Sequence, residues 1–156
     1  MLFLPSVTEK VPTMSSSAPY PLTGSCNCGD VVYQVNAPFL GQVACHCRQC
    51  QQHTQSAFSL VGGLNARDFV IVSGALSCWT KTADSGNRID CYFCPRCGNR
   101  IYHQNPDNPD HIRLKLGTLH NTDVINPTMH IWTEQKQAWY TLPDDVASHP
   151  RQPPAQ

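Results

Sequence analysis

Nine cysteines are the residues of this chain best suited to chemistry. Seven of them fall in three short motifs, Cys-x-Cys, Cys-x-Cys-x-x-Cys and Cys-x-x-Cys, and the other two stand alone. Thiolates are soft ligands, and two cysteines on one turn can fill two corners of a metal's coordination tetrahedron. Disulfides are the alternative, but the count is odd and the apolar start Met1–Leu4 is too short for a signal-peptide core. The spacing therefore favours zinc, with iron in a four-sulfur site left open.

The first and last motifs are predicted to form one closed site from Cys26, Cys28, Cys94 and Cys97. Cys28 and Cys97 are each followed by glycine, two variable residues, a β-branched residue and tyrosine. Glycine at that place fits a knuckle turn, in which a residue with positive φ lets backbone N–H groups point at a sulfur. Two facing knuckles leave a metal no open position. We expect a structural zinc that supports folding.

The middle motif supplies three closely spaced ligands, Cys45, Cys47 and Cys50. Three protein ligands with an open fourth position are typical of catalytic zinc. His46 lies between two of these cysteines, and adjacent side chains of an extended segment point to opposite faces. His46 is therefore expected to point away from the metal; the alternative is that it is a fourth ligand.

A metal held by three thiolates favours chemistry at a thiol. The site would carry a formal charge of minus one, so the ion would acidify water less than one held by neutral histidines. A thiol is the better fourth ligand, because coordination deprotonates it at a pH where a free thiol, of pKa about 8.5, is mostly protonated. The open site predicts an enzyme that acts on a small thiol.

Short β-rich runs must position these motifs. They lie at 31–35, 58–61, 69–72, 88–93 and 112–116, and a single helical turn is expected at 51–55. In the last run Ile112, Leu114 and Leu116 alternate with Arg113 and Lys115, which predicts a core face and a water face. We expect one all-β domain at 22–142, after a flexible lead-in at 1–21 and before a flexible tail at 143–156.

The composition excludes several classes of partner. Eleven basic and eleven acidic side chains cancel, so no global field attracts nucleic acid or an anionic membrane. No apolar run approaches the roughly 18 residues that a membrane helix needs. A cytoplasmic protein without nucleic-acid or membrane partners is the expectation.

The motifs resemble those of the glutathione-dependent formaldehyde-activating enzymes, which share their domain with centromere protein V. The elements that carry the resemblance are Gly24-Ser-Cys-Asn-Cys-Gly29, Cys45-His-Cys-Arg-Gln-Cys50, Phe93-Cys-Pro-Arg-Cys-Gly98, Gly117-Thr-Leu119 and a segment from Pro127 to His130. The resemblance implies an all-β fold of twisted antiparallel sheets, a β-tent stapled by zinc knuckles. It implies two zinc ions at the two cysteine sets. It also implies a carbon–sulfur lyase that forms S-hydroxymethylglutathione from glutathione and formaldehyde.

Other residues receive simpler interpretations. His103 and His130 are candidate acid–base groups, because a proton must move when formaldehyde becomes a hydroxymethyl group. Cys78 and Cys91 are expected to fill the core. The tryptophans are expected in the core or a pocket wall; they are Trp79, Trp132 and Trp139. Cations that could bind the carboxylates of glutathione are Arg48, Arg67, Arg88, Arg96 and Arg100.

Two other functions compete with the thiol enzyme. One is a zinc-stapled binding module in which both metals are structural. The other is a redox or metal sensor that uses the middle cysteines reversibly.

Overall fold

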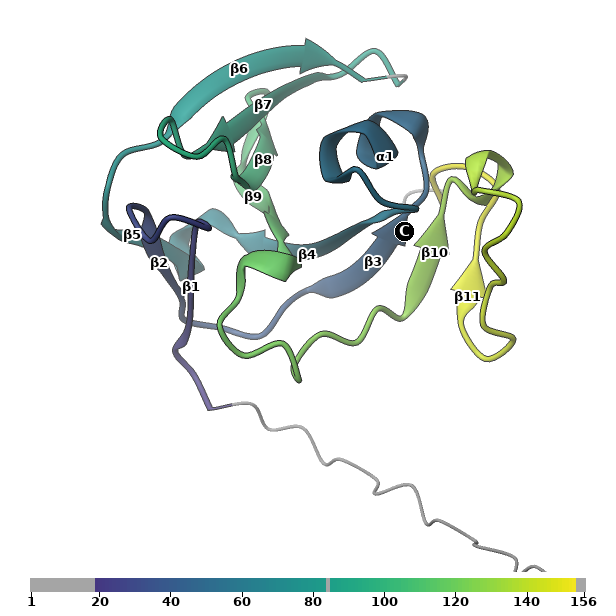
Figure 1. Cartoon of the computed structure of the whole chain (residues 1–156), viewed down its shortest axis with the longest axis horizontal. Helices are drawn as coiled ribbons and strands as arrows, with labels where there is room; N and C mark the ends of the chain where they lie inside the picture. The colour runs from purple at the N-terminus through teal and green to yellow at the C-terminus, as the bar shows by residue number, and fades with distance from the viewer. Residues whose placement is uncertain (1–18, 84, 154–156) are drawn as a thin grey trace, which may run out of the picture.

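The computed structural model describes residues 19–83 and 85–153, and these residues form two β-sheets (Figure 1). The smaller sheet has the strand order β1-β2-β5, and the larger has the order β11-β10-β3-β4-β9-β8-β7-β6. The strands are β1 (Leu22–Ser25), β2 (Val32–Val35), β3 (Gly41–Cys45), β4 (Ser59–Asn65), β5 (Phe69–Ser73), β6 (Ser77–Thr82), β7 (Arg88–Phe93), β8 (Arg100–Asn105), β9 (Asn108–Lys115), β10 (Met129–Ile131) and β11 (Ala147–Ser148). The predicted all-β class is confirmed.

The strands pair antiparallel, except that β10 runs parallel to both β3 and β11. All five predicted β-rich runs are strands in the structure. The helical turn expected at 51–55 is helix α1 (Arg48–Thr54), and three short 3-10 helices are η1 (Ala66–Asp68), η2 (Leu116–Thr118) and η3 (Thr133–Gln135). Among the described residues, no helix is both long and apolar enough to cross a membrane.

The hydrophobic core lies between the two sheets. Tyr33 and Val35 from the smaller sheet, with Val31 just before β2, form one cluster with Leu114 from the larger sheet and Leu116 just after β9, and all five are fully buried. The period-two alternation along β9 produces this contact, because it turns every second side chain of that strand toward the smaller sheet.

The other face of the larger sheet holds a helix. Figure 1 shows the sheet bending upward beyond β4, so that β6 and β7 stand over β3 and β4, with α1 on the concave side. Lys81 of β6 donates a hydrogen bond to Gln49 of α1, and the ring of His53 of α1 packs at a tilt against Trp79 of β6, with 5.7 Å between ring centroids. The bend therefore encloses space between α1 and the far strands.

The segment expected to be a flexible tail contains β11. Ala147 and Ser148 pair with Met129 and His130, and the N–H of His149 donates to the His130 carbonyl at 2.8 Å. This contact uses backbone groups on an open sheet edge, which side-chain patterns do not reveal. Of the expected lead-in at 1–21, residues 1–18 lie outside the described ranges.

Candidate metal and substrate site

The four cysteines of the predicted closed site meet in space. The sulfurs of Cys26, Cys28, Cys94 and Cys97 lie within 4.8 Å of one another. The Sγ atoms of Cys26 and Cys28 are 3.5 Å apart, and those of Cys28 and Cys94 are 3.8 Å apart. Zn–S bonds of about 2.3 Å separate tetrahedral sulfurs by about 3.8 Å, so this donor set fits zinc.

Two knuckle turns build this cluster, as the repeated Cys-Gly pattern predicts. Gly29 and Gly98 have φ of +78° and +73°. Their N–H groups donate to the carbonyls of Cys26 and Cys94 at 3.0 and 2.9 Å. The N–H of Asn27 in one knuckle donates to Oδ1 of Asn99 in the other at 3.0 Å. The two turns therefore hold each other as well as the sulfurs.

Backbone donors favour thiolates in this cluster. The N–H groups of Asn99 and Cys28 lower the pKa of Cys97 to about 6. Burial raises the pKa of Cys26, but the N–H of Val31, 3.2 Å from its sulfur, and contacts with neighbouring cysteines lower it overall. The N–H of Asp30 lowers the pKa of Cys28, but burial and contacts with the other three cysteines raise it to about 12. Metal binding needs the deprotonated form, so the backbone donors favour it at Cys26 and Cys97, whereas Cys28 would lose its proton only to the metal.

The middle motif forms a second cluster. The sulfurs of Cys45, Cys47 and Cys50 also lie within 4.8 Å of one another. Cys45 ends β3, and Cys47 caps α1 by accepting from the N–H of Cys50 at 3.4 Å. Hydrogen bonds from Cys45 and Cys50 lower the pKa of Cys47, and contact with Cys47 raises the pKa of Cys45. Three thiols suit zinc, and these cysteines leave a fourth position free.

His46 points away from this cluster, as the alternation predicts. It is fully buried, and its Nε2 lies 2.8 Å from Nδ1 of His130. Phe58 and Tyr140 each lie 5.2 Å from the His46 ring. Burial and the charges of His130 and Lys136 lower the pKa of His46 to about 4. His46 therefore anchors the segment between two of the cysteines in an aromatic pocket.

A cavity of about 980 Å³ opens beside the second cluster, and all three of its cysteines line it. Its walls come from the concave face of the larger sheet, from α1 and from the C-terminal segment, which contributes Gln152 and Pro153. The lining includes His103 but not His130, so one of the two candidate acid–base histidines lies in the cavity and the other is paired with His46.

Positive charge dominates the cavity. Its lining cations are Lys81, Arg100, Arg113 and Lys115, and no aspartate or glutamate from residues 19–83 or 85–153 lines it. Burial and the charges of Lys115, Arg100, Lys81 and Arg113 lower the pKa of His103 well below its ordinary value. Burial and the charges of Arg100, Lys81 and Lys115 likewise lower the pKa of His53 to about 4. Both imidazoles are therefore neutral near pH 7.

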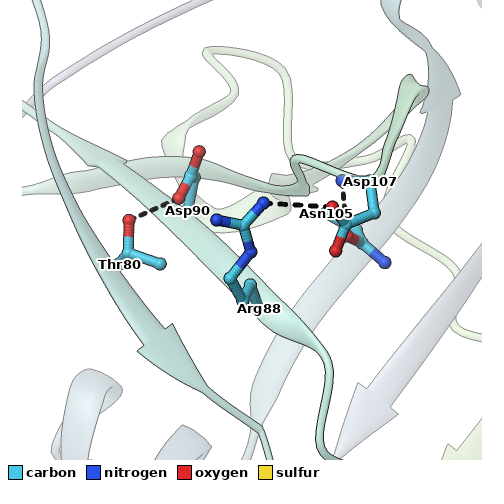
Figure 2. A network of polar contacts seen from close by, with 5 residues as sticks. All are labelled: Thr80, Arg88, Asp90, Asn105 and Asp107. Carbon is cyan, nitrogen blue, oxygen red and sulfur yellow. Dashed lines mark hydrogen bonds and ion pairs between the residues drawn. The ribbon is translucent and has the colours of Figure 1, made fainter.

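Five arginines were candidates to bind the carboxylates of glutathione, and among them Arg100 is the one that lines the cavity. Figure 2 shows Arg88 turned toward Asp107, with 3.0 Å between Nη2 and Oδ1. Arg96 faces Asp30 at 3.6 Å, Arg48 donates to Gln51, and Arg67 is exposed.

Sequence reasoning missed Lys81 and placed Arg113 and Lys115 in water. Arg113 is exposed but lines the cavity, and half-buried Lys115 donates from Nζ to Ser59 Oγ at 3.1 Å. The alternation along β9 correctly puts Arg113 and Lys115 on the face away from the core. It does not reveal that α1 and β6 cover this face and make it a cavity wall.

Two other interpretations are wrong in part. Cys91 is buried, but Cys78 is exposed because it lies on β6, which is an edge strand of the larger sheet. Trp132 lines the cavity and Trp79 lines a smaller one of about 340 Å³, whereas Trp139 is 71% exposed and packs edge-on against Tyr140.

Comparison with known proteins gives a family and a similar fold. The family described as "Glutathione-dependent formaldehyde-activating enzyme" matches residues 21–135, which include both cysteine clusters. A crystal structure of a Rhodobacter sphaeroides protein is 24% identical and covers 68% of this chain and 92% of that chain, with a TM-score of 0.51. At that identity the likeness concerns the fold alone.

Proposed function

Because the chain belongs to the glutathione-dependent formaldehyde-activating enzyme family, we propose that it binds two zinc ions and adds a small thiol, glutathione in the first instance, to formaldehyde. The observation that carries the proposal is the three-cysteine cluster at the wall of a cationic cavity. A cavity near 1,000 Å³ is within the range that small-molecule sites occupy. A reducing compartment such as the cytoplasm would keep the seven thiols available to metal.

The two clusters divide the work. Cys26, Cys28, Cys94 and Cys97 would hold a structural zinc, and Cys45, Cys47 and Cys50 would hold the second ion. When bound there, zinc supplies a Lewis acid that favours the thiolate form of the substrate thiol at neutral pH.

The reaction forms one carbon–sulfur bond. The thiol sulfur attacks the formaldehyde carbon, the C=O π bond breaks, and the carbonyl oxygen takes up the proton that the sulfur gave up. His103 lines the cavity and could carry this proton; its lowered pKa makes it a weak proton acceptor and a strong donor toward the oxygen. The lysines beside the cluster, Lys81 and Lys115, hold positive charge where the negative oxygen develops.

The family resemblance and the free fourth position support an enzyme over a purely structural module. In a module, the fourth position would have no substrate to take, and the cavity beside it would have no use.

The test is a glutathione titration of protein in which cobalt replaces zinc. We expect two metal ions per chain, and glutathione should change the absorption bands of one of them. The same protein should then form S-hydroxymethylglutathione when formaldehyde is added. Cys47→Ser should lose the spectral response and the activity, and Cys78→Ser, at an exposed cysteine outside both clusters, should keep them. Absence of a spectral response to every small thiol would overturn the proposal.

A further inference from the structure

Arg100 differs from the two lysines that line the same cavity. Lys81 donates a hydrogen bond to Gln49, and Lys115 donates one to Ser59. Both lysines therefore have a hydrogen-bond acceptor within the fold.

Arg100 has no such partner. Its Nε and Nη1 atoms are buried, and they have no hydrogen-bond partner among residues 19–83 and 85–153. Nδ1 of His111, in the same cavity, is likewise buried and unpaired within those ranges. A buried donor without an acceptor costs about 1–3 kcal/mol, and more when it is charged. A group that brings oxygen acceptors into the cavity would remove that penalty.

An irregular strand pairing puts Arg100 on the cavity side of β8, where it lines both the large cavity and the smaller one beside Trp79. Along β7 and β8, Tyr92 pairs with Tyr102 and Phe93 with Arg100, so one step on β7 corresponds to two residues on β8. Such a bulge turns the following side chain to the other face of the strand. It places Arg100 on the cavity side together with His103, although regular alternation would separate them.

The closed cysteine cluster fixes the base of this side chain. Arg100 begins β8 three residues after Cys97, and the carbonyl of Asn99 accepts from the N–H of Cys94 at 3.0 Å. The knuckle that holds two ligands of the closed cluster therefore ends at the arginine. A guanidinium on so short and tethered a segment is preorganised for an anion, which lowers the entropy lost on binding.

We infer that Arg100 binds a carboxylate of the thiol substrate, so that the cavity selects anionic thiols over neutral ones. The inference rests on the proposed function, because it takes the cavity as the substrate site. Arg forms paired hydrogen bonds to carboxylates, and the surrounding positive field of Lys81, Arg113 and Lys115 favours the same charge.

The first test uses a probe that has the carboxylates of glutathione but no free thiol. S-methylglutathione binding to the zinc-loaded full chain is measured by calorimetry for wild type, Arg100→Gln and Arg96→Gln. Arg96 is the matched control, since it lies in the same knuckle but faces Asp30 outside the cavity. We expect Arg100→Gln to weaken binding about tenfold or more, as loss of a charge-assisted pair does, and Arg96→Gln to leave it unchanged. Equal weakening in both variants, or no binding by the wild type, would overturn the inference.

The second test separates this inference from the proposed function. Mercaptopropionate and mercaptoethanol, which differ in a carboxylate, are titrated into cobalt-substituted protein. Wild type should prefer mercaptopropionate by about tenfold, Arg100→Gln should lose that preference while still binding mercaptoethanol, and Arg100→Glu should instead prefer cationic cysteamine. If both thiols bind wild type equally, the thiol site stands and the role of Arg100 is wrong. If neither thiol alters the spectrum, the proposed function fails. The calorimetric comparison of Arg100→Gln with Arg96→Gln then supports or contradicts the anion site without it. Melting temperature and metal content confirm that each variant is folded.

Discussion

At the scale of single residues, the two cysteine clusters occupy different places in the fold although their ligands are the same. The closed cluster ties the β1–β2 turn to the β7–β8 turn, and Cys26 and Cys94 are part of the main core. The three-cysteine cluster lies at the end of β3 and the start of α1, at the wall of the cavity. Loss of a ligand should therefore damage the fold in the first case and the chemistry in the second.

Cys97→Ser is expected to unfold the protein or lower its stability by several kcal/mol, because binding free energy at a structural zinc site is folding free energy. Cys47→Ser should lose one metal ion per chain and keep a cooperative melting transition. Metal analysis with thermal melting measures both effects, and Cys78→Ser serves as the control at an exposed cysteine. Equal loss of stability in the two cluster variants would mean that both clusters are structural.

His53 provides a residue-scale prediction on pH. Its folded pKa, about 4, lies below the value of about 6.5 in an unfolded chain, chiefly because of burial and then because of nearby cations. The unfolded state therefore binds more protons between these values, so the contribution of neutral His53 to stability is present above pH 6.5 and is lost as pH falls toward 4. Wild type should lose more stability than His53→Gln between pH 7.5 and about 5.5, a window chosen from that shift.

Denaturant unfolding at several pH values, with metal content checked at each, tests this prediction. Acid release of metal affects both proteins, so the difference between them isolates the histidine. If the two stability curves stay parallel over this range, His53 does not titrate as described.

At the scale of elements, one glutamine holds α1 against η3. Gln51 is buried, and its Nε2 donates to the carbonyls of His46 and Gln135 at 2.6 and 2.8 Å. Its Oε1 accepts from Nη1 of Arg48 at 2.6 Å. The contact joins the cysteine-bearing segment to a loop more than eighty residues later.

Gln51→Ala should lower the free energy of unfolding by about 2–3 kcal/mol, because it leaves one buried and one partly buried carbonyl without this donor. Exposed Gln52 is the matched control on the same helix, and Gln52→Ala should change stability by less than about 0.5 kcal/mol. Urea denaturation gives both values. A further expected result is weaker metal binding at the three-cysteine cluster, since His46 lies between two of its ligands. A Gln51→Ala protein as stable as Gln52→Ala would contradict the described hydrogen bonds.

The sequence predicts a feature well when the residues that form it are close together along the chain, and poorly when the feature depends on a distant strand. The Cys-Gly knuckles are local, so their positive-φ glycines and their four sulfurs follow from spacing. The alternation along β9 likewise places Leu114 in the core. The cavity face of Arg100 depends on a bulge against β7, and the exposure of Cys78 depends on β6 being an edge strand. Neither the bulge nor the edge is visible in the order of residues, because both are set by a partner strand.

At the scale of the whole molecule, the two faces of the larger sheet serve separate purposes. One face packs against the smaller sheet and is apolar. The other curves around α1 and carries cations beside the three-cysteine cluster. The hydrophobic core and the cationic cavity thus lie on opposite faces of one sheet, and residues that alternate along β9 line both.

The C-terminal segment completes the cavity face, so its removal tests the architecture. A chain that ends at Pro143 would lose β11, and with it the backbone hydrogen bonds from Thr133 to His149 and from His149 to His130, at 3.1 and 2.8 Å. It would also lose Gln152 and Pro153 from the cavity wall. The N–H groups of Trp132 and Glu134 would lose their acceptors as well, the carbonyls of Arg151 and Pro150. At about 1 kcal/mol or somewhat less for each of these four hydrogen bonds, stability should fall by roughly 2–4 kcal/mol, and glutathione should bind more weakly while the closed cluster keeps its metal. Arg151→Ala, which breaks the exposed 2.9 Å pair with Glu134, is the control and should cost less than about 1 kcal/mol. Melting curves and glutathione titrations of both proteins decide the matter, and a truncated chain that matches wild type in both would show that the segment is a dispensable tail.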